Sequence, residues 1–431
     1  MSNYIYRLFG YRAVKDAEIL IDGITVLAGD NGTGKSTLSR WLYYIVKVLS
    51  EYEGLIDKEA TTELRTLLLR LEKASIFFDD NSSELRYAYA EMRNSLNSNT
   101  NISCQIEKMF EFVEKYVRLV SEKIKELGID SNTTKRMLTL FDLENSVFSD
   151  TEELIEAINT KLLNSIVKIQ EEIKSKKESR TTKTFSELLP TTAEDADNIT
   201  LQVDFLEDGV ELLDDKHFSP VLNLNRVIYY KTYELMDYLN NDSDFKRYLE
   251  NPAGKMTDQE KFIYKIASQI IGGNLNLHDD GWSFNRKQLY YKRKDGLEIP
   301  LRQASTGLIS FSYLVRLLEN GYLRKGTLLI IDEPEAHLHP KWIVEYARIL
   351  VMLQKNLDLK IVLSTHNPDM LAAIDAIARK EDISDKVNFY FAKADTSDGD
   401  YKFIYERQGS IGGIFDSFNI ALSSIQAYGD E

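Results

Sequence analysis

The 431-residue chain is poor in cysteine, proline and histidine, with 1 Cys, 7 Pro and 5 His. A single cysteine, Cys104, cannot form an internal disulfide bond, which excludes a disulfide-stabilised extracellular scaffold and favours a reducing compartment. The first residues contain no apolar run of signal-peptide length, and no stretch reaches the roughly 18 apolar residues of a membrane-spanning helix. We therefore expect a soluble cytoplasmic protein with no membrane partner.

An excess of positive charge is also lacking, because 53 Lys and Arg stand against 68 Asp and Glu, a formal net charge of −15. This balance disfavours a uniformly basic nucleic-acid-binding protein, although it is compatible with a local basic patch. Hydrophobic residues make up 43% of the chain and include 24 Tyr and 19 Phe. Such a composition supports a sizeable packed core and excludes a disordered chain.

Secondary-structure patterns divide the chain into three parts. The first, residues 1–50, has strand patterns around a turn at Asp22-Gly23 and then a helical pattern over residues 35–51. Charged amphipathic helices dominate residues 51–197. Strand patterns return in residues 198–431, including a strand–helix–strand unit over residues 327–331, 342–353 and 360–364. We expect an α/β head, a mixed sheet with flanking helices assembled from both chain ends, and an inserted helical lobe.

The insert contains two heptad patterns. Apolar residues at alternating spacings of four and three predict one helix up to Gly128, a typical C-cap. The second pattern covers residues 155–173 and follows an expected capping box at residues 149–152. The two helices are expected to pack antiparallel as a short coiled-coil arm, about 30 Å long at ~1.5 Å per residue. Residues 174–183 are rich in Lys, Ser and Thr and are interpreted as a solvated linker.

The most specific motif is GDNGTGKS at residues 29–36, which matches G-x-x-x-x-G-K-[ST] between an expected strand and an expected helix. Its glycines let consecutive backbone N–H groups turn towards phosphates, and the helix N-terminus adds free N–H groups. Lys35 is expected to reach the β- and γ-phosphates of ATP, and the Ser36 hydroxyl to ligate Mg²⁺. The candidate nucleotide-binding residues are Gly29, Asn31, Gly32, Gly34, Lys35, Ser36 and Thr37.

Two adjacent acids follow the apolar residues 328–331. Because ligands of α/β proteins bind at the carboxyl edge of the sheet, Asp332 is expected to hold Mg²⁺ through its water shell. Glu333 is expected to polarise the attacking water as a general base. A solvated acidic pair at a strand end is the alternative. His366 ends the next expected strand and either senses the γ-phosphate or has a structural role.

A Ser-x-Gly sequence begins another amphipathic helix. Ser305 and Gly307 are compatible with an ordinary helix cap, and equally with backbone N–H groups that hold a phosphate from another protomer.

The order of these motifs resembles the ABC ATPase head shared by SMC, RecF and OLD proteins. Residues 331–340, IDEPEAHLHP, most closely resemble the OLD and RecF-like branch. The resemblance covers residues 1–45 and about 198–395 but not the helical insert. It implies a P-loop ABC-type ATPase head that forms a head-to-head dimer, or a higher oligomer, with shared ATP sites.

The resemblance also assigns roles to the motifs. Residues 29–37 form the Walker A loop, and Asp332 with Glu333 the Walker B pair. The helix start at residues 305–307 is the signature motif that closes on the partner's γ-phosphate. His366 is the switch histidine, and Arg12 occupies a place where the family often has an arginine near the nucleotide.

Residues 337–339 occupy the dimer-facing D-loop according to the resemblance. The alternative reading of His337 and His339 as a metal pair lacks a third ligand in the sequence.

Two family features are absent from the sequence. Too few residues follow His366 for the Toprim nuclease of OLD proteins, and the insert is shorter than an SMC arm with its hinge. The remainder resembles stand-alone ATPases of anti-phage systems, such as the Septu, PARIS and retron-associated types. That resemblance implies an ATPase sensor that controls a separate effector, such as a nuclease, until a trigger such as a phage protein arrives.

Two other functions stay open. A RecF-like DNA repair ATPase would bind duplex DNA through several phosphate-facing Lys or Arg, for which residues 174–183 are the one dense candidate. A nucleotide-gated scaffold with little turnover is excluded by no residue.

Overall fold

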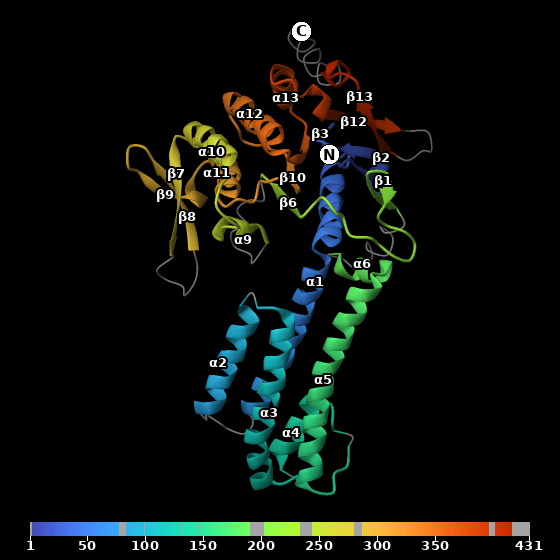
Figure 1. Cartoon of the computed structure of the whole chain (residues 1–431), viewed down its shortest axis with the longest axis vertical. Coiled ribbons are helices and arrows are strands. Elements are labelled where there is room, and N and C mark those ends of the chain that lie inside the picture. The colour runs from blue at the N-terminus through green and yellow to red at the C-terminus, as the bar shows by residue number, and fades with distance from the viewer. Residues whose placement is uncertain are drawn as a thin grey trace, which may run out of the picture. The chain divides into compact units, whose positions relative to one another are not determined.

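The computed structural model describes residues 2–76, 83–98, 100–129, 131–144, 146–189, 202–232, 244–279, 287–395 and 401–415. The chain forms two compact units (Figure 1). The first, here called the head, comprises Met1–Glu51 and Phe185–Glu431, and the second, the helical unit, comprises Tyr52–Thr184. The boundary predicted after residue 197 falls in residues 190–201, which lie outside the described residues.

The head contains a curled ten-stranded sheet in the order β5-β4-β1-β2-β13-β12-β3-β11-β10-β6. Its central strands β12, β3, β11, β10 and β6 are mutually parallel, whereas β1 pairs antiparallel with both β2 and β4. Strands from both chain ends therefore alternate across the sheet, which confirms the predicted mixed sheet. The strands are β1 Tyr4–Tyr11, β2 Val14–Ile21, β3 Ile24–Ala28, β4 Val203–Glu207, β5 Val210–Glu211, β6 Arg226–Lys231, β10 Thr327–Asp332, β11 Lys360–Thr365, β12 Val387–Asp395 and β13 Lys402–Gln408.

Helices flank this sheet, and a smaller antiparallel sheet of β7 Gly273–Asp279, β8 Lys287–Arg293 and β9 Glu298–Pro300 lies beside α10 and α11 (Figure 1). The predicted strand–helix–strand unit is present as β10, α12 and β11, with β10 and β11 parallel. The head helices are the first part of α1 (Lys35–Ile76), α9 Asp244–Glu250, α10 Asp258–Ile271, α11 Thr306–Glu319, α12 Pro340–Leu357 and α13 Pro368–Lys380; α6 Thr182–Leu188 spans the boundary between the units.

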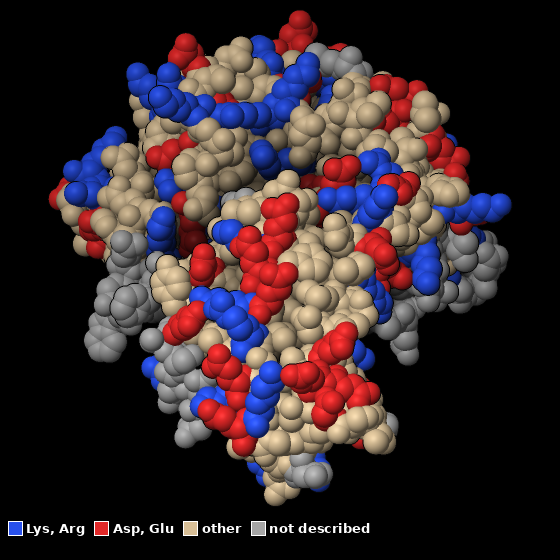
Figure 2. All heavy atoms as spheres, turned by 60° about the horizontal axis from the view of Figure 1, so that its bottom comes forward, with Lys and Arg blue, Asp and Glu red and all other residues tan. Residues whose placement is uncertain are grey.

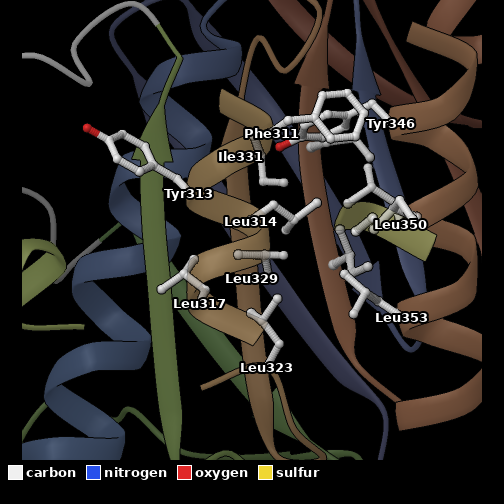
Figure 3. Packing of buried hydrophobic residues seen from close by; sticks show 14 of the residues in the cluster. Phe311, Tyr313, Leu314, Leu317, Leu323, Leu329, Ile331, Tyr346, Leu350 and Leu353 are labelled. Atoms are coloured by element: carbon white, nitrogen blue, oxygen red, sulfur yellow. The ribbon is translucent and has the colours of Figure 1, made fainter. Parts of the chain in front are cut away.

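One hydrophobic core fixes α11 and α12 against strand β10 (Figure 3). Ile331 of β10 and Leu314 of α11 are completely or almost completely buried there. The ring of Phe311 on α11 meets that of Tyr346 on α12 edge-on, with centroids 4.9 Å apart. The N-terminus of α11 is consequently held in a defined place relative to the end of β10.

The helical unit is a bundle rather than the predicted two-helix arm. Helices α3 (Ile102–Leu127) and α5 (Thr151–Ser179) lie side by side in opposite directions, as expected (Figure 1). However, α2 (Ser83–Asn97), α4 (Asn132–Leu140) and the second part of α1 contribute side chains to the same core. Helix α1 continues to Ile76, past a kink at Glu51 where the predicted helix ended.

The N-cap of α5 is also shifted by one residue from the predicted capping box. The carboxylate of Asp150 accepts hydrogen bonds from the amides of Glu152 and Glu153 at 2.9 and 2.8 Å. The Glu153 carboxylate accepts from the Ser149 amide at 2.6 Å. Asp150 therefore caps the helix in place of Ser149, and Glu153 takes the reciprocal role that was predicted for Glu152.

The basic segment predicted as a solvated linker is largely helical, since α5 continues to Ser179. Its Lys176 and Lys177 pair with Glu59 and Asp57 of α1 at 2.9 and 2.6 Å. On the face shown in Figure 2, acidic and basic side chains are interspersed over most of the surface. Arg180 likewise pairs with Glu53 at 3.3 Å. The segment is consequently a weaker candidate for a phosphate-binding patch, because three of its five basic residues have acidic partners.

Among the helices that the structure describes, none has the length and apolarity needed to span a membrane.

Candidate nucleotide site

The glycine-rich loop connects the fully buried strand β3 to helix α1. Gly32 and Gly34 have φ angles of +83° and +95°, a region that side chains disfavour. An added Cβ at Gly34 would lie 2.8 Å from Cγ2 of Val14, and one at Gly29 would lie 2.9 Å from Cβ of Ala392. The loop thus packs closely against the β1–β2 turn and strand β12, where glycine is required.

The Lys35 side chain is hydrogen-bonded to the backbone of this loop. Its Nζ donates hydrogen bonds of 2.7 Å to the carbonyl oxygens of both Gly29 and Asp30. Burial lowers the pKa of Lys35, while the nearby carboxylates of Glu333 and Asp332 act in the opposite direction. Ser36 and Thr37 are half-buried in the first turn of α1, whose leading N–H groups have no intrahelical acceptor. This arrangement suits the binding of phosphate groups.

Asp332 is fully buried at the carboxyl end of β10. Register places it beside Ser364 of β11 on one side and Lys231 of β6 on the other. The Ser364 hydroxyl donates to Oδ1 of Asp332, and Nζ of Lys231 lies 3.7 Å from Oδ2. Oδ2 itself has no hydrogen-bond partner among the described residues. A buried carboxylate oxygen without a donor is a suitable acceptor for a cation or its water shell.

Glu333 adopts a left-handed backbone with φ of +53°, which is uncommon outside glycine and asparagine-like residues. Its amide donates to the carbonyl of Ser364 at 2.9 Å. Its side chain is 25% exposed, and its Oε1 lies 3.7 Å from Nδ1 of His366, which is 43% exposed. The two predicted catalytic side chains are therefore adjacent and open to solvent at the end of β10 and β11.

Glu335 links the same two strand ends, although sequence reasoning gave it no role. Its Oε1 accepts from the Thr365 hydroxyl at 2.6 Å and from the His366 amide at 3.2 Å. Nδ1 of His366 lies 3.6 Å from the same oxygen. Burial raises the pKa of Glu335, opposed mainly by its hydrogen bond from Thr365. The available sequence signal was a third acid within four residues after an apolar strand.

The structure does not bring Ser305 and Gly307 to the phosphate loop, and within the described part of the chain no hydrogen bond joins Ser305 to that loop. Ser305 caps α11, with its Oγ accepting from the Leu308 amide at 3.4 Å, and it is exposed. An added Cβ at Gly307 would lie 2.9 Å from Cδ2 of Leu338 and 3.3 Å from the carbonyl oxygen of His337. The predicted signature motif and D-loop therefore touch each other within one chain.

Arg12 lies in the tight turn between β1 and β2 with φ of +52° and is exposed. The following residues, Ala13 and Val14, are the ones that pack against Gly34. Arg12 thus directly precedes the residues that pack against the loop, although its guanidinium is placed 5.3 Å from the ring centroid of Tyr11.

His339 caps α12, and its Nδ1 accepts from the Lys341 amide at 3.3 Å. Among the described residues, no group of three or more His, Cys, Asp or Glu side chains could hold a metal ion. Mg²⁺ commonly binds through one or two protein oxygens, water and substrate phosphates, and the buried Oδ2 of Asp332 and the Ser36 hydroxyl are oxygens of the right kind.

Comparison with protein families gives a match to the AAA ATPase domain over residues 7–371. The chain belongs to this family. The match includes the loop, the acidic strand end and His366 within one ATPase domain, with the helical unit inside its span.

Within curated proteins, this AAA ATPase domain protein is 34% identical over 115 residues to the energy-coupling factor transporter ATP-binding proteins EcfA2 and EcfA3 of two Clostridium perfringens strains. The match spans 26% of this chain and 40% of each relative. The Smc head domain of Pyrococcus furiosus aligns with a TM-score of 0.35 and 12% identity over 99% of this chain and 100% of that one. The SMC head domain of Thermotoga maritima aligns with a TM-score of 0.36 and 9% identity over 95% and 100%. Scores of this size do not establish a common fold.

Proposed function

We propose that the chain binds ATP with Mg²⁺ and hydrolyses the terminal phosphate. The observation that carries this proposal is the meeting of the loop and the acidic strand ends at one edge of the sheet, since β3, β11 and β10 are adjacent parallel strands. In this proposal, the loop amides and Lys35 hold the phosphates, and Ser36 and Asp332 hold the metal. Mg²⁺, when bound, supplies positive charge that offsets charge on the phosphate oxygens.

Glu333 acts as general base in this proposal, because its side chain is solvent-accessible beside His366. The carboxylate accepts the proton of the attacking water. His366, whose amide is anchored by Glu335, donates a hydrogen bond to the terminal phosphate and detects its departure. Arg12 contributes positive charge from the turn that abuts the loop.

Two variants test this function. Glu333→Gln is expected to keep ATP binding and to lower the hydrolysis rate by about 10²–10⁴-fold, because an amide cannot accept the proton. Lys35→Met is expected to abolish binding while preserving the buried stem of the side chain. Nucleotide binding is measured by calorimetry and hydrolysis by phosphate release. Wild-type hydrolysis by Glu333→Gln would show that the base is a different residue.

We further infer that the active form contains two copies facing each other, with Ser305 and Gly307 of one copy completing the site of the other. This inference is supported by the exposure of Ser305, His337 and His339 at the joined signature helix and D-loop. Helix N-termini with free N–H groups favour a phosphate. Sedimentation of the Glu333→Gln variant with and without Mg·ATP tests this arrangement, which requires ATP-dependent formation of a dimer or larger oligomer.

As the cellular role, we propose a regulatory ATPase of an anti-phage system that controls a separate effector such as a nuclease. The support is the resemblance of the motif order and a helical unit with its own hydrophobic core, which offers a surface distinct from the nucleotide site. The test is phage plating on cells that express the chain with its neighbouring genes. Protection is expected for wild type and not for Lys35→Met, and equal plating of the two would refute this role.

A further inference from the structure

A pocket of about 470 Å³ lies in the head between α10 and the adjoining ends of β7 and β8, and it shares no lining residue with the nucleotide site. Its lining includes no acidic residue and four basic ones, which are Lys265 of α10, Lys292 and Arg293 of β8, and Lys294 of the turn that follows. The chain as a whole carries a formal net charge of −15. The pocket is therefore a local excess of positive charge on an acidic protein.

Three of these four charges have no carboxylate partner. Arg293 pairs with Asp295, whose two carboxylate oxygens both lie 2.9 Å from Nε. The ammonium groups of Lys265, Lys292 and Lys294 form no ion pair with any residue that the structure describes, and all three side chains are exposed. Because like charges repel, an anion held between these groups would lower the electrostatic free energy of the pocket.

The backbone that carries the lysines is fixed by close contacts. A Cβ added at Gly273 would lie 2.4 Å from the carbonyl oxygen of Lys292, so the start of β7 passes directly against the end of β8. The Tyr291 hydroxyl donates a hydrogen bond of 2.6 Å to the carbonyl oxygen of Ile271, the last residue of α10. The ends of α10 and β8 are thus joined, and a ligand can meet both sides of the pocket with little reorganisation of the backbone.

We propose that this pocket binds a compact anion with several phosphate charges, such as the oligophosphate group of a small molecule. Its volume falls within the roughly 300–1,000 Å³ of small-molecule sites. Acidic residues border it, since the β8–β9 register places Glu298 opposite Lys292, and Asp295 follows Lys294 in the turn. A nucleic-acid backbone, which carries charge along its whole length, would pass over these carboxylates, whereas a compact anion meets the lysines alone.

The test uses inorganic tripolyphosphate as the probe and the full chain with Lys35→Met, which removes the loop lysine as a competing phosphate ligand. Calorimetry without Mg²⁺ is expected to show one tripolyphosphate bound per chain. Adding Lys265→Gln and Lys292→Gln is expected to weaken binding by about 10–100-fold, because two charge-assisted contacts are lost. The pair Lys265→Arg and Lys292→Arg keeps both charges and is expected to retain binding.

The matched control is Lys255→Gln with Lys287→Gln. Both lysines are exposed and lie outside the pocket, and Lys287 is at the opposite end of β8. This pair changes the net charge of the chain by the same amount, so it should alter the affinity by less than about 3-fold. Exposed substitutions of this kind should leave the unfolding temperature of every variant unchanged.

Equal weakening by the two glutamine pairs would overturn the proposal, because the effect would then come from net charge alone. Absence of tripolyphosphate binding would overturn it as well. A short DNA duplex supplies the comparison with nucleic acid. If the duplex binds through Lys265 and Lys292 and tripolyphosphate does not displace it, the lysines form a nucleic-acid surface and the compact anion is refuted. The pocket shares no residue with the nucleotide site, so failure of ATP binding by wild type would refute the proposed function and leave this site standing.

Discussion

Ser305 offers a sharp test of the shared site, because Asp and Asn differ there in charge but not in capping ability. Both are good N-caps, so each should replace the weak 3.4 Å bond to the Leu308 amide. Exposed substitutions that keep the cap change stability by less than about 0.5 kcal/mol. Gly307 is a less suitable position, since a Cβ there would lie 2.9 Å from Leu338 within the same chain.

The expected effect of Ser305→Asp follows from Coulomb's law. A carboxylate about 4 Å from one phosphate charge costs about 4 kcal/mol at an effective dielectric constant of about 20. This energy corresponds to a decrease of about 10³-fold in the population of the closed dimer for each occupied site, and a closed Ser305→Asp dimer contains two such sites. We therefore expect Ser305→Asp to hydrolyse ATP at least about 10³-fold more slowly than Ser305→Asn, with equal unfolding temperatures and equal affinity for ATP in the open monomer.

The assay is phosphate release by each variant and by mixtures. A mixed dimer of Ser305→Asp and Lys35→Met contains one site with an intact loop and an intact Ser305 from opposite chains. Hydrolysis should therefore reappear on mixing two inactive variants. Equal rates for the Asp and Asn variants would refute the proximity of Ser305 to phosphate, and a verified mixed dimer without hydrolysis would refute shared sites.

Two further predictions concern single side chains. Burial raises the pKa of Glu335 in the folded chain above its unfolded value, so the stabilising protonated form is lost as the pH rises through the folded pKa. Glu335→Gln should hence raise the unfolding temperature at neutral pH. Thermal scans at falling pH should show a smaller difference in unfolding temperature between the variant and wild type. A difference that grows on acidification would contradict a raised pKa for Glu335. Gly34→Ala should lower stability by about 1–3 kcal/mol and abolish ATP binding, because its Cβ combines positive φ with a 2.8 Å approach to Val14. Gly32→Ala, which has positive φ but no atom within 4 Å of the new Cβ, is the control in chemical denaturation and should be less damaging.

The phosphate loop and the acidic strand end were predictable because each is a contiguous sequence pattern. Lys231 and Glu335 were not, since their importance depends on partners on other strands. Lys231 meets Asp332 only through the β6–β10 register. Glu335 meets Thr365 and the His366 amide only where the turn after β10 folds over the end of β11. The apolar pattern of one strand does not identify the strands that will lie beside it in the sheet.

The helical unit was predicted less well for a different reason. The heptad patterns identified α3 and α5, and the two helices do pack together. The pattern over residues 35–51 gave no sign that α1 continues to Ile76 and adds Leu64, Leu68 and Leu71 to the same core. Because the predicted helix ended at residue 51, the sequence did not indicate that Asp57 and Glu59 lie on the same helix, beside α5. Residues 174–183 consequently looked unpaired, although the partners of Lys176 and Lys177 lie on α1.

Backbone strain gives independent support to the site. Among the described residues, the non-glycine positions with positive φ are Arg12, Asp142, Arg180, Asp208, Glu333, His337, Asp358 and Asp382. Aspartate tolerates this conformation, which leaves four residues to explain. Arg180 is the left-handed C-cap of α5, a common position for such a residue. Of the other three, Arg12 and Glu333 were selected from the sequence for a role at the nucleotide, and His337 for the dimer-facing D-loop.

Strained backbone persists only where the surrounding structure enforces it. At Glu333 the enforcing contacts are visible: the paired strands β10 and β11 fix the residue before it, and its amide is held by the Ser364 carbonyl. A glycine would relieve the strain but would remove the carboxylate. A glutamate in a left-handed conformation beside His366 is what the proposed general base requires, and Glu333→Gln tests that role.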